Sequence, residues 1–355
     1  MMTNQRAYEL AFLALSLTGF TLLWLLMAYN GTLVALLKAA WTGVFADGRP
    51  LRSSYTGFFP IDFAIAVLVA FYDSQTDGQD AGTWIFIFNF LIMLQTAGVW
   101  VLVEGNRRGV MGHYLTISWL WPLLWNLFGA AIILPLYFSL HIRSMDPVRL
   151  DPMISTGRGR SFIPLTTIIG FVPMVAMHLG YVLSADTSRQ IVTACFPLSP
   201  ILSVIVEKFI FPASKKTRER EDEVDNVGKI YLVTGLLCAG FHLYTMAVAL
   251  FSLASETAFS RMFIPSPSNV VSGNPDILRE GGLLFLQYDW WIVNISCAMW
   301  IYLLVERSEI VLRVGKGVRA LAILVAMLVF GPGATMNAAL WAREWTLRAQ
   351  FQHCR

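Results

Sequence analysis

Long apolar runs separated by short polar segments dominate the chain. Runs of about 20 apolar residues are long enough to cross a bilayer as helices. They predict spanning helices at residues 7–29, 58–73, 83–103, 114–140, 161–183, 190–211, 229–254, 283–305 and 320–341. The run 31–45 carries Lys38 and is too short to span comfortably, so it predicts a segment at the membrane surface.

Composition agrees with this pattern. Hydrophobic residues make up 56% of the chain and charged residues 14%, whereas soluble domains carry about 25% charged residues. We therefore expect an all-α fold, a polytopic transmembrane helical bundle of about nine helices, with eight or ten as alternatives. Residues 1–355 show no repeat and no second domain, and the net charge of +3 does not indicate a nucleic-acid partner.

The distribution of Lys and Arg predicts the orientation of these helices. With nine spans, more of the 26 cations fall on the side that holds the N-terminus. Cations concentrate in cytosolic loops, so we expect a cytosolic N-terminus and a multi-pass protein of the endoplasmic reticulum. Asn30, in the triplet Asn30-Gly31-Thr32, is then lumenal and a candidate for glycosylation.

Motifs for metal, phosphate and covalent chemistry are absent from the sequence. The four cysteines have no CxxC spacing, which argues against a zinc site and a disulfide framework. There is no DDxxD, NDxxDxxxD, DxDD, HExxH, GxSxG or P-loop motif. We therefore expect no metal and no cofactor, and magnesium–diphosphate chemistry of the prenyltransferase type is not indicated.

Six carboxylates lie in or at the ends of predicted helices, and Glu9, Glu207 and Glu306 are explained as ordinary solvated helix ends. Two of the other three also have structural explanations. Asp62 follows Pro60 at a predicted helix start, where an acid caps the helix. Glu104 ends the third predicted helix and precedes Arg107 and Arg108, with which it can form an ion pair. A functional role remains the alternative for each of these two acids.

Asp289 is harder to explain structurally. It lies about six residues into the predicted helix 283–305, where a charge is costly, by about 3 kcal/mol on insertion scales. Pairing with His178 or Tyr181 is the structural alternative. The order of the predicted helices places Asp289 in the same half of the membrane as Glu104 and Asp62, so a pocket that opens to one face is expected.

The residue types predicted in or near this half of the membrane suggest acid catalysis on an apolar substrate. A carboxyl in an apolar cavity remains protonated more readily and can act as a general acid. Aromatic faces attract passing positive charge, although tryptophans in membrane proteins are more often interface anchors. The residues expected to bind substrate are Asn126, Trp125, His178, Tyr181, Tyr288 and Trp290.

Three stretches carry a family resemblance. "VLVEGNRRG" (101–109), "WLWPLLWNLFGAAIILPLYFSLH" (119–141) and "FLQYDWWIVNISCAMW" (285–300) resemble fungal integral-membrane terpene cyclases of meroterpenoid biosynthesis, of the ascochlorin and ascofuranone type. "FFPIDFAIAVLVAFY" (58–72) also fits their second helix. The resemblance covers most of the chain in order and hydropathy, and its specific motifs cover about a fifth.

The resemblance implies a reaction and a set of acids. Members of this family act without metal, protonate the terminal epoxide of an epoxidised farnesyl chain on an aromatic head group, and close rings through a carbocation. By motif, their two key acids fall on Glu104 and Asp289. Either acid is then the proton donor, and the other, with Asp62, orients the substrate or takes the final proton.

Two other classes remain as alternatives. A proton-coupled small-molecule transporter also uses intramembrane acids, but no inverted repeat or matching pair of broken helices is visible. A non-catalytic membrane receptor or scaffold needs no such acids. The expected partners of the cyclase are a hydrophobic, epoxidised prenyl-aromatic substrate and the lipid membrane.

Overall fold

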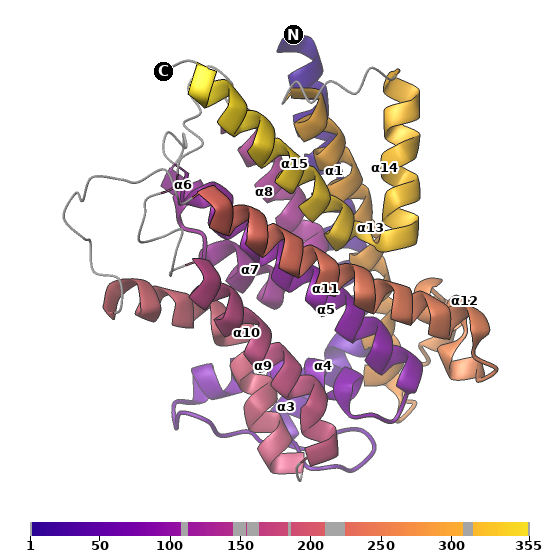
Figure 1. Ribbon diagram of the computed structural model, residues 1–355. Coiled ribbons are helices and arrows are strands. Elements are labelled where there is room, and N and C mark those ends of the chain that lie inside the picture. Colours follow the sequence, from indigo (N-terminus) through magenta and orange to yellow (C-terminus); the bar gives the residue numbers. More distant parts are fainter. Residues whose placement is uncertain are drawn as a thin grey trace.

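The structure is a computed structural model that describes residues 2–107, 113–144, 154, 163–183, 186–209, 224–307 and 315–353 (Figure 1). Within these residues the regular structure is helical, with two isolated β-bridges, Val44 to Pro50 and Arg107 to Ile154, and no strand. The all-α prediction is therefore confirmed.

In the part of the chain that the structure describes, the first half forms one long, interrupted helix followed by six further helices. The long helix consists of α1 (Met2–Phe20), a π-helical turn η1 (Thr21–Leu25) and α2 (Leu26–Tyr29). The elements that follow are α3 (Thr32–Thr42), α4 (Phe59–Thr76), α5 (Ala81–Gly105), α6 (His113–Thr116), α7 (Leu120–Phe128) and α8 (Ala130–Ser144).

The described residues of the second half contain six helices of 15 to 31 residues. They are α9 (Ile163–Leu183), α10 (Asp186–Phe209), α11 (Val224–Phe251), α13 (Ile277–Arg307), α14 (Lys316–Phe330) and α15 (Pro332–His353). The segment between α11 and α13 is a compact connection with three short elements, η4 (Ser255–Thr257), α12 (Phe259–Phe263) and η5 (Pro267–Asn269).

The described helices include five that are long and apolar enough to cross a membrane, which is compatible with a membrane protein. They are Gln5–Tyr29, Ala81–Gly105, Ile163–Gly180, Asn226–Phe251 and Ile277–Glu306. The predicted number of about nine spans is not supported. The N- and C-termini lie at the same end of the bundle (Figure 1).

Two predicted spans are broken by glycines. The predicted helix 114–140 divides at Gly129, whose φ of 98° ends α7 before α8 begins. The predicted helix 320–341 divides at Gly331, whose φ of 86° separates α14 from α15. A positive φ is available to glycine without the clash that a β-carbon makes, so these two glycines permit turns inside apolar sequence.

The core is built around α5, which is buried along most of its length. It packs against α9 and α11, and α1 packs against α8, which in turn packs against α13. Trp100 of α5 and Trp300 of α13 are among the largest fully buried side chains. This packing brings α13, which carries Asp289, against the broken pair α7 and α8.

Candidate active site

Asp289 caps a helix that begins inside the bundle. It lies twelve residues after Ile277, the first residue of α13, so it is deeper in its helix than the sequence predicted, and 3% of its surface is exposed. Its carboxyl accepts hydrogen bonds from the backbone N–H groups of Ala130, at 3.2 Å, and Ala131. The first N–H groups of a helix have no partner within it, and here Asp289 supplies one.

The break that frees these N–H groups requires glycine. Besides its positive φ, a β-carbon at Gly129 meets Leu23 Cδ1 at 2.7 Å and the ring of Phe285 at 3.3 Å. The sequence therefore fixes the start of α8, and with it the position of the two donors that face Asp289. Among the described residues, no cation forms an ion pair with Asp289.

A cavity of about 80 Å³ lies beside Asp289, between α13, α4, α5 and α7. The structure places two of the predicted substrate-binding residues, Trp125 and Asn126, in its wall. Aromatic rings make up much of the rest, namely Trp24, Phe71, Tyr72, Phe90 and Phe285. The cavity thus combines one carboxyl with several ring faces, an arrangement that suits a positively charged intermediate.

Two polar residues of the wall are held by hydrogen bonds. Asn126 donates from Nδ2 to the carbonyl oxygen of Pro197 at 3.3 Å. The hydroxyl of Tyr72 donates to the backbone oxygen of Asn126 at 3.2 Å. These bonds join α4, α7 and α10 around the cavity, so its shape is fixed by residues that lie far apart in the sequence.

Glu104 lies in a separate, buried cluster of charges. Its Oε1 accepts from Arg107 Nε and from Arg343 Nη1, each at 3.0 Å, and Arg107 also pairs with Glu344. His141 Nε2 lies 3.4 Å from Glu104 Oε2. The ion pair with Arg107 agrees with the structural alternative for Glu104, and Arg108 lies outside the described residues. Glu104 does not line the cavity at Asp289.

His141 links this cluster to α13. Trp300 Nε1 donates to His141 Nδ1 at 3.2 Å. Because Nδ1 is then an acceptor, a neutral His141 carries its proton on Nε2 and donates toward Glu104. The cluster therefore holds α5, α8, α13 and α15 together, and the part taken by Arg343 and Glu344 of the last helix was not predicted.

The structure does not place the other predicted site residues in the cavity wall. Asp62 accepts from Thr56 N at 2.6 Å, Thr56 Oγ1 at 2.8 Å and Gly57 N at 3.0 Å, so it holds the loop that precedes α4. This geometry matches the structural alternative, in which Asp62 stabilises a helix start. It also means that the three acids do not converge on one pocket.

Three aromatic or histidine positions also lie elsewhere, and the fourth is outside the described side chains. His178 is fully buried, its Nδ1 lies 3.1 Å from Met174 O, and its ring lies 4.3 Å from that of Phe88. Trp290 packs on Phe263 at 5.1 Å. Tyr288 is partly buried in the second apolar cluster of the protein, and the side chain of Tyr181 lies outside the described part of the structure.

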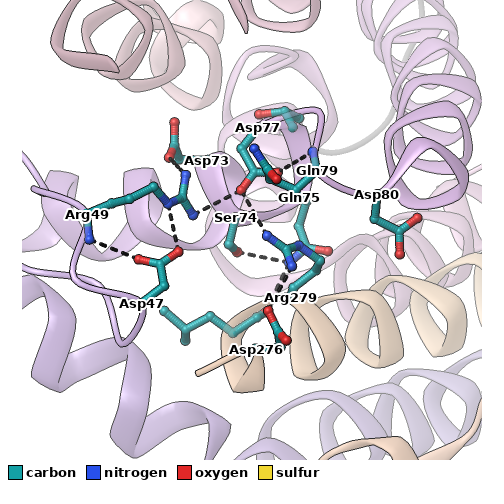
Figure 2. Close-up of polar contacts among 12 residues, drawn as sticks. Asp47, Arg49, Asp73, Ser74, Gln75, Asp77, Gln79, Asp80, Asp276 and Arg279 are labelled. Carbon is teal, nitrogen blue, oxygen red and sulfur yellow. Dashed lines mark hydrogen bonds and ion pairs between the residues drawn. The ribbon is translucent and has the colours of Figure 1, made fainter. Parts of the chain in front are cut away.

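A second charged network gathers around the acidic segment "DSQTDGQD" (73–80) between α4 and α5. Asp73 is fully buried and accepts two hydrogen bonds from Arg189, at 2.8 and 3.0 Å. Asp77 pairs with Arg49 at 2.9 Å and with Arg279 at 3.3 Å (Figure 2). The network joins the loop after α3, the end of α4, and the starts of α10 and α13.

In the loop after α3, Arg49 stabilises the charged form of Asp47. Burial raises the pKa of Asp47, but hydrogen bonds from the backbone and guanidinium of Arg49 outweigh it and lower that pKa below its usual value. Arg49 Nε lies 2.7 Å from Asp47 Oδ2 (Figure 2). Because α4 supplies Phe71 and Tyr72 to the cavity wall directly before Asp73, the network anchors that wall from outside.

The described residues form an all-helical protein, with five helices long and apolar enough to cross a membrane and a carboxyl group in an aromatic-walled cavity, and they contain no cluster of side chains suited to a metal ion. This is the arrangement expected of a protein that acts on an apolar chain. The CtvD domain matches residues 8–348, so the chain belongs to the CtvD-domain family.

Similar proteins that are named terpene cyclases support this assignment. Terpene cyclase DEP1 of Fusarium langsethiae is 28% identical, with 94% of this chain and 97% of the relative aligned. Terpene cyclase DEP1 of Alternaria brassicicola is 27% identical over the same shares. Terpene cyclase ascI of Acremonium egyptiacum is 23% identical, over 86% of this chain and 83% of the relative. No solved structure matches. The predicted membership of the fungal terpene cyclases is confirmed.

Proposed function

We propose that this protein is a multi-pass membrane cyclase that protonates the terminal epoxide of an epoxyfarnesyl-aromatic substrate, with Asp289 as the proton donor. The observation that carries the proposal is that Asp289 is the carboxyl in the wall of the aromatic cavity, without a cation partner among the described residues. We further propose that the protein resides in the endoplasmic reticulum with a cytosolic N-terminus.

The choice of Asp289 over Glu104 follows from their partners. Two guanidinium groups at 3.0 Å favour the ionised form of Glu104, and a carboxylate has no proton to give. Asp289 has no such partner, and an apolar cavity favours the neutral form of an unpaired carboxyl. We therefore assign Glu104 to holding the helices together and Asp289 to the chemistry.

The reaction balances without a co-reactant. The Asp289 carboxyl gives its proton to the epoxide oxygen, and the bond from that oxygen to the more substituted carbon breaks. An alkene of the chain attacks the resulting cation and closes a ring, and a proton is finally lost to a base. The N–H groups of Ala130 and Ala131 stabilise the carboxylate that Asp289 becomes.

The wall of the cavity has two tasks in this scheme. Ring faces such as those of Trp125 and Phe285 attract the cation and exclude water. The cavity of about 80 Å³ is smaller than the roughly 300–1,000 Å³ of small-molecule sites, so side chains of the wall must move apart when substrate enters.

The experiment is a conversion assay in microsomes that contain the protein. An epoxyfarnesyl phenol should give a product of equal mass and new retention, because cyclisation only rearranges atoms whereas hydrolysis adds water. The Asp289→Asn variant keeps an oxygen for the N–H groups but has no acidic proton, so product should be lost while the protein level holds. Asp276→Asn, an exposed acid near the start of the same helix, is the matched control. Full activity of Asp289→Asn refutes the assignment.

A further inference from the structure

A second cavity, of about 50 Å³, lies between α5, α7, α9 and α10. It shares two helices with the cavity at Asp289, because α5 and α7 contribute to both walls. On α5, Leu94 lines the Asp289 cavity and the next residue, Gln95, lines the second one. The two cavities therefore adjoin, and the proposed cyclisation uses only one of them.

The wall of the second cavity carries polar side chains without partners. Gln95, Ser118 and Ser199 line it and make no hydrogen bond to any described residue. Ser199 is only 2% exposed, and none of the three side chains has a polar atom that is fully enclosed by protein. The neighbouring Thr167, in contrast, donates to Ile163 O at 2.9 Å. Buried polar groups normally have partners, so these three side chains indicate a ligand that forms hydrogen bonds.

A glycine on α9 leaves room for the amide of Gln95. A β-carbon at Gly170 would lie 2.7 Å from Gln95 Oε1. The side chain of Gln95 therefore reaches across from α5 to α9, and its polar end lies at the wall that both helices form. A larger residue in place of Gly170 would displace that end.

The ring of Trp125 separates the two cavities. Gly98 lines the second cavity, and a β-carbon there would lie 3.8 Å from Pro122 Cγ and 3.9 Å from Cζ2 of Trp125, which lines the cavity at Asp289. Trp125 is 3% exposed, and its Nε1 makes no hydrogen bond to any described residue. The ring can therefore turn aside without breaking a hydrogen bond, and such a movement would join the two cavities.

We propose that the second cavity binds the oxygen substituents of the aromatic head group, while the prenyl chain passes Trp125 and brings its terminal epoxide to Asp289. The inference rests on the proposed function, because it assumes the same substrate. Epoxide and head group are at opposite ends of the farnesyl chain, so a site for one requires a separate site for the other. Pro122 and Trp125 are roughly 4.5 Å apart along α7, a distance that this chain exceeds.

The chemistry of the wall suits such a head group. A phenol hydroxyl both donates and accepts hydrogen bonds, as do the serine hydroxyls and the amide of Gln95. A cavity needs roughly 10–15 Å³ for each water-sized group, so about 50 Å³ holds a few oxygen substituents. The ring of the head group enters as the side chains of the wall move apart.

Equilibrium binding of a tritiated epoxyfarnesyl phenol to the purified full-length protein in lipid nanodiscs tests the proposal. Each protein carries Asp289→Asn, so that the probe is not consumed. Ser118→Ala and Ser199→Ala should each weaken binding of the phenol about fivefold. Binding of the analogue that lacks the ring hydroxyl should not change. Ser139→Ala, at a buried serine of α8 that lines neither cavity, is the matched control and should bind both compounds normally.

Gly98→Ala tests the passage between the cavities. Its methyl group makes only ordinary contacts with Pro122 and Trp125, and Ala favours a helix more than Gly, so the melting temperature should not fall. The added methyl group narrows the path of the prenyl chain. Binding of the phenol and of its analogue should therefore weaken alike, by at least about fivefold.

The outcomes separate this inference from the proposed reaction. A protein that shows the expected pattern of binding but makes no product in the conversion assay refutes the reaction and leaves this site standing. If the serine variants bind the phenol like their parent, the cavity holds water only and the proposal is overturned. Equal weakening of both compounds by the serine variants overturns it as well, as does the absence of saturable binding to the parent.

Discussion

Replacing Glu104 by Gln tests whether this residue supports the fold or supplies the proton. In the structure, the negative charges of Glu104 and Glu344 balance the positive charges of Arg107 and Arg343. The variant removes one negative charge and leaves the buried cluster with one uncompensated guanidinium. A neutral amide accepts hydrogen bonds but cannot offset that charge.

The expected loss of stability is large. Breaking a buried ion pair by removing one partner destabilises a protein by about 3–5 kcal/mol, because the remaining charge is left buried. Glu104 contacts Arg107 and Arg343 at 3.0 Å each, which favours the upper part of that range, and the retained amide oxygen favours the lower part. We expect about 3 kcal/mol, a substantial share of the roughly 5–15 kcal/mol by which proteins are stable.

Thermal melting in detergent, followed by size-exclusion chromatography, measures this effect. The Glu104→Gln variant should melt roughly 5–10 °C below the parent protein. The double variant Glu104→Gln with Arg343→Gln restores charge balance and should recover part of that loss, as a double-mutant cycle shows. If Glu104→Gln melts like the parent and yet makes no cyclised product, Glu104 is a reacting acid and the structural assignment is wrong.

Three more predictions follow from the cavity and its supports. Gly129→Ala should lower the melting temperature, because it adds about 1–3 kcal/mol of backbone strain and a steric clash. Gly48→Ala, also at positive φ but with open space around it, should be destabilised by the backbone strain alone. Equal decreases in melting temperature refute the clash. Arg189→Gln should destabilise the protein by about 3 kcal/mol, because it removes both hydrogen bonds to the buried Asp73 carboxylate and leaves it only the more distant Arg49, at 3.8 Å. Unchanged melting contradicts this. Trp125→Leu should reduce turnover about tenfold with little change in melting, since a ring face stabilises a cation by about 1–2 kcal/mol; unchanged turnover in the conversion assay excludes that role.

The sequence identified Asp289 for a physical reason that the structure bears out. A single acid inside a long apolar run must either find partners or do chemistry, and the structure gives it two backbone donors and a cavity. Trp125 and Asn126 were also recognisable, because a polar amide beside a tryptophan is conspicuous inside an apolar run. These features are local, so a linear pattern contains them.

The partners of Glu104 were not recognisable because they depend on tertiary packing. Glu104 and Arg343 are separated by 239 residues, and nothing in hydropathy shows which helices become neighbours. The same holds for Asp73 and Arg189, which are 116 residues apart. The predicted grouping of Asp62, Glu104 and Asp289 relied on counting spans, and two glycine breaks made that count unreliable.

The helix breaks were missed because the apolar pattern is continuous across them. Gly129 is one of 26 glycines in the chain and has no proline or polar residue beside it to mark a turn. Gly331 is followed by Pro332, a turn signal, but it lies inside an apolar run long enough to span a membrane. Their effect on the backbone comes from what surrounds them in space, such as His242, which lies 2.7 Å from the position of a β-carbon at Gly331.

Asp289, on α13, accepts hydrogen bonds from the first N–H groups of α8. Activity and stability therefore make opposing demands on this one side chain. An aspartate that caps a helix is most useful to the fold as a fixed anion, whereas a proton donor must alternate between its neutral and charged forms. Asn is as good a helix cap as Asp and carries no charge to bury. The Asp289→Asn protein should therefore melt no lower than its parent, which would mark Asp289 as a residue retained at the expense of the most stable sequence.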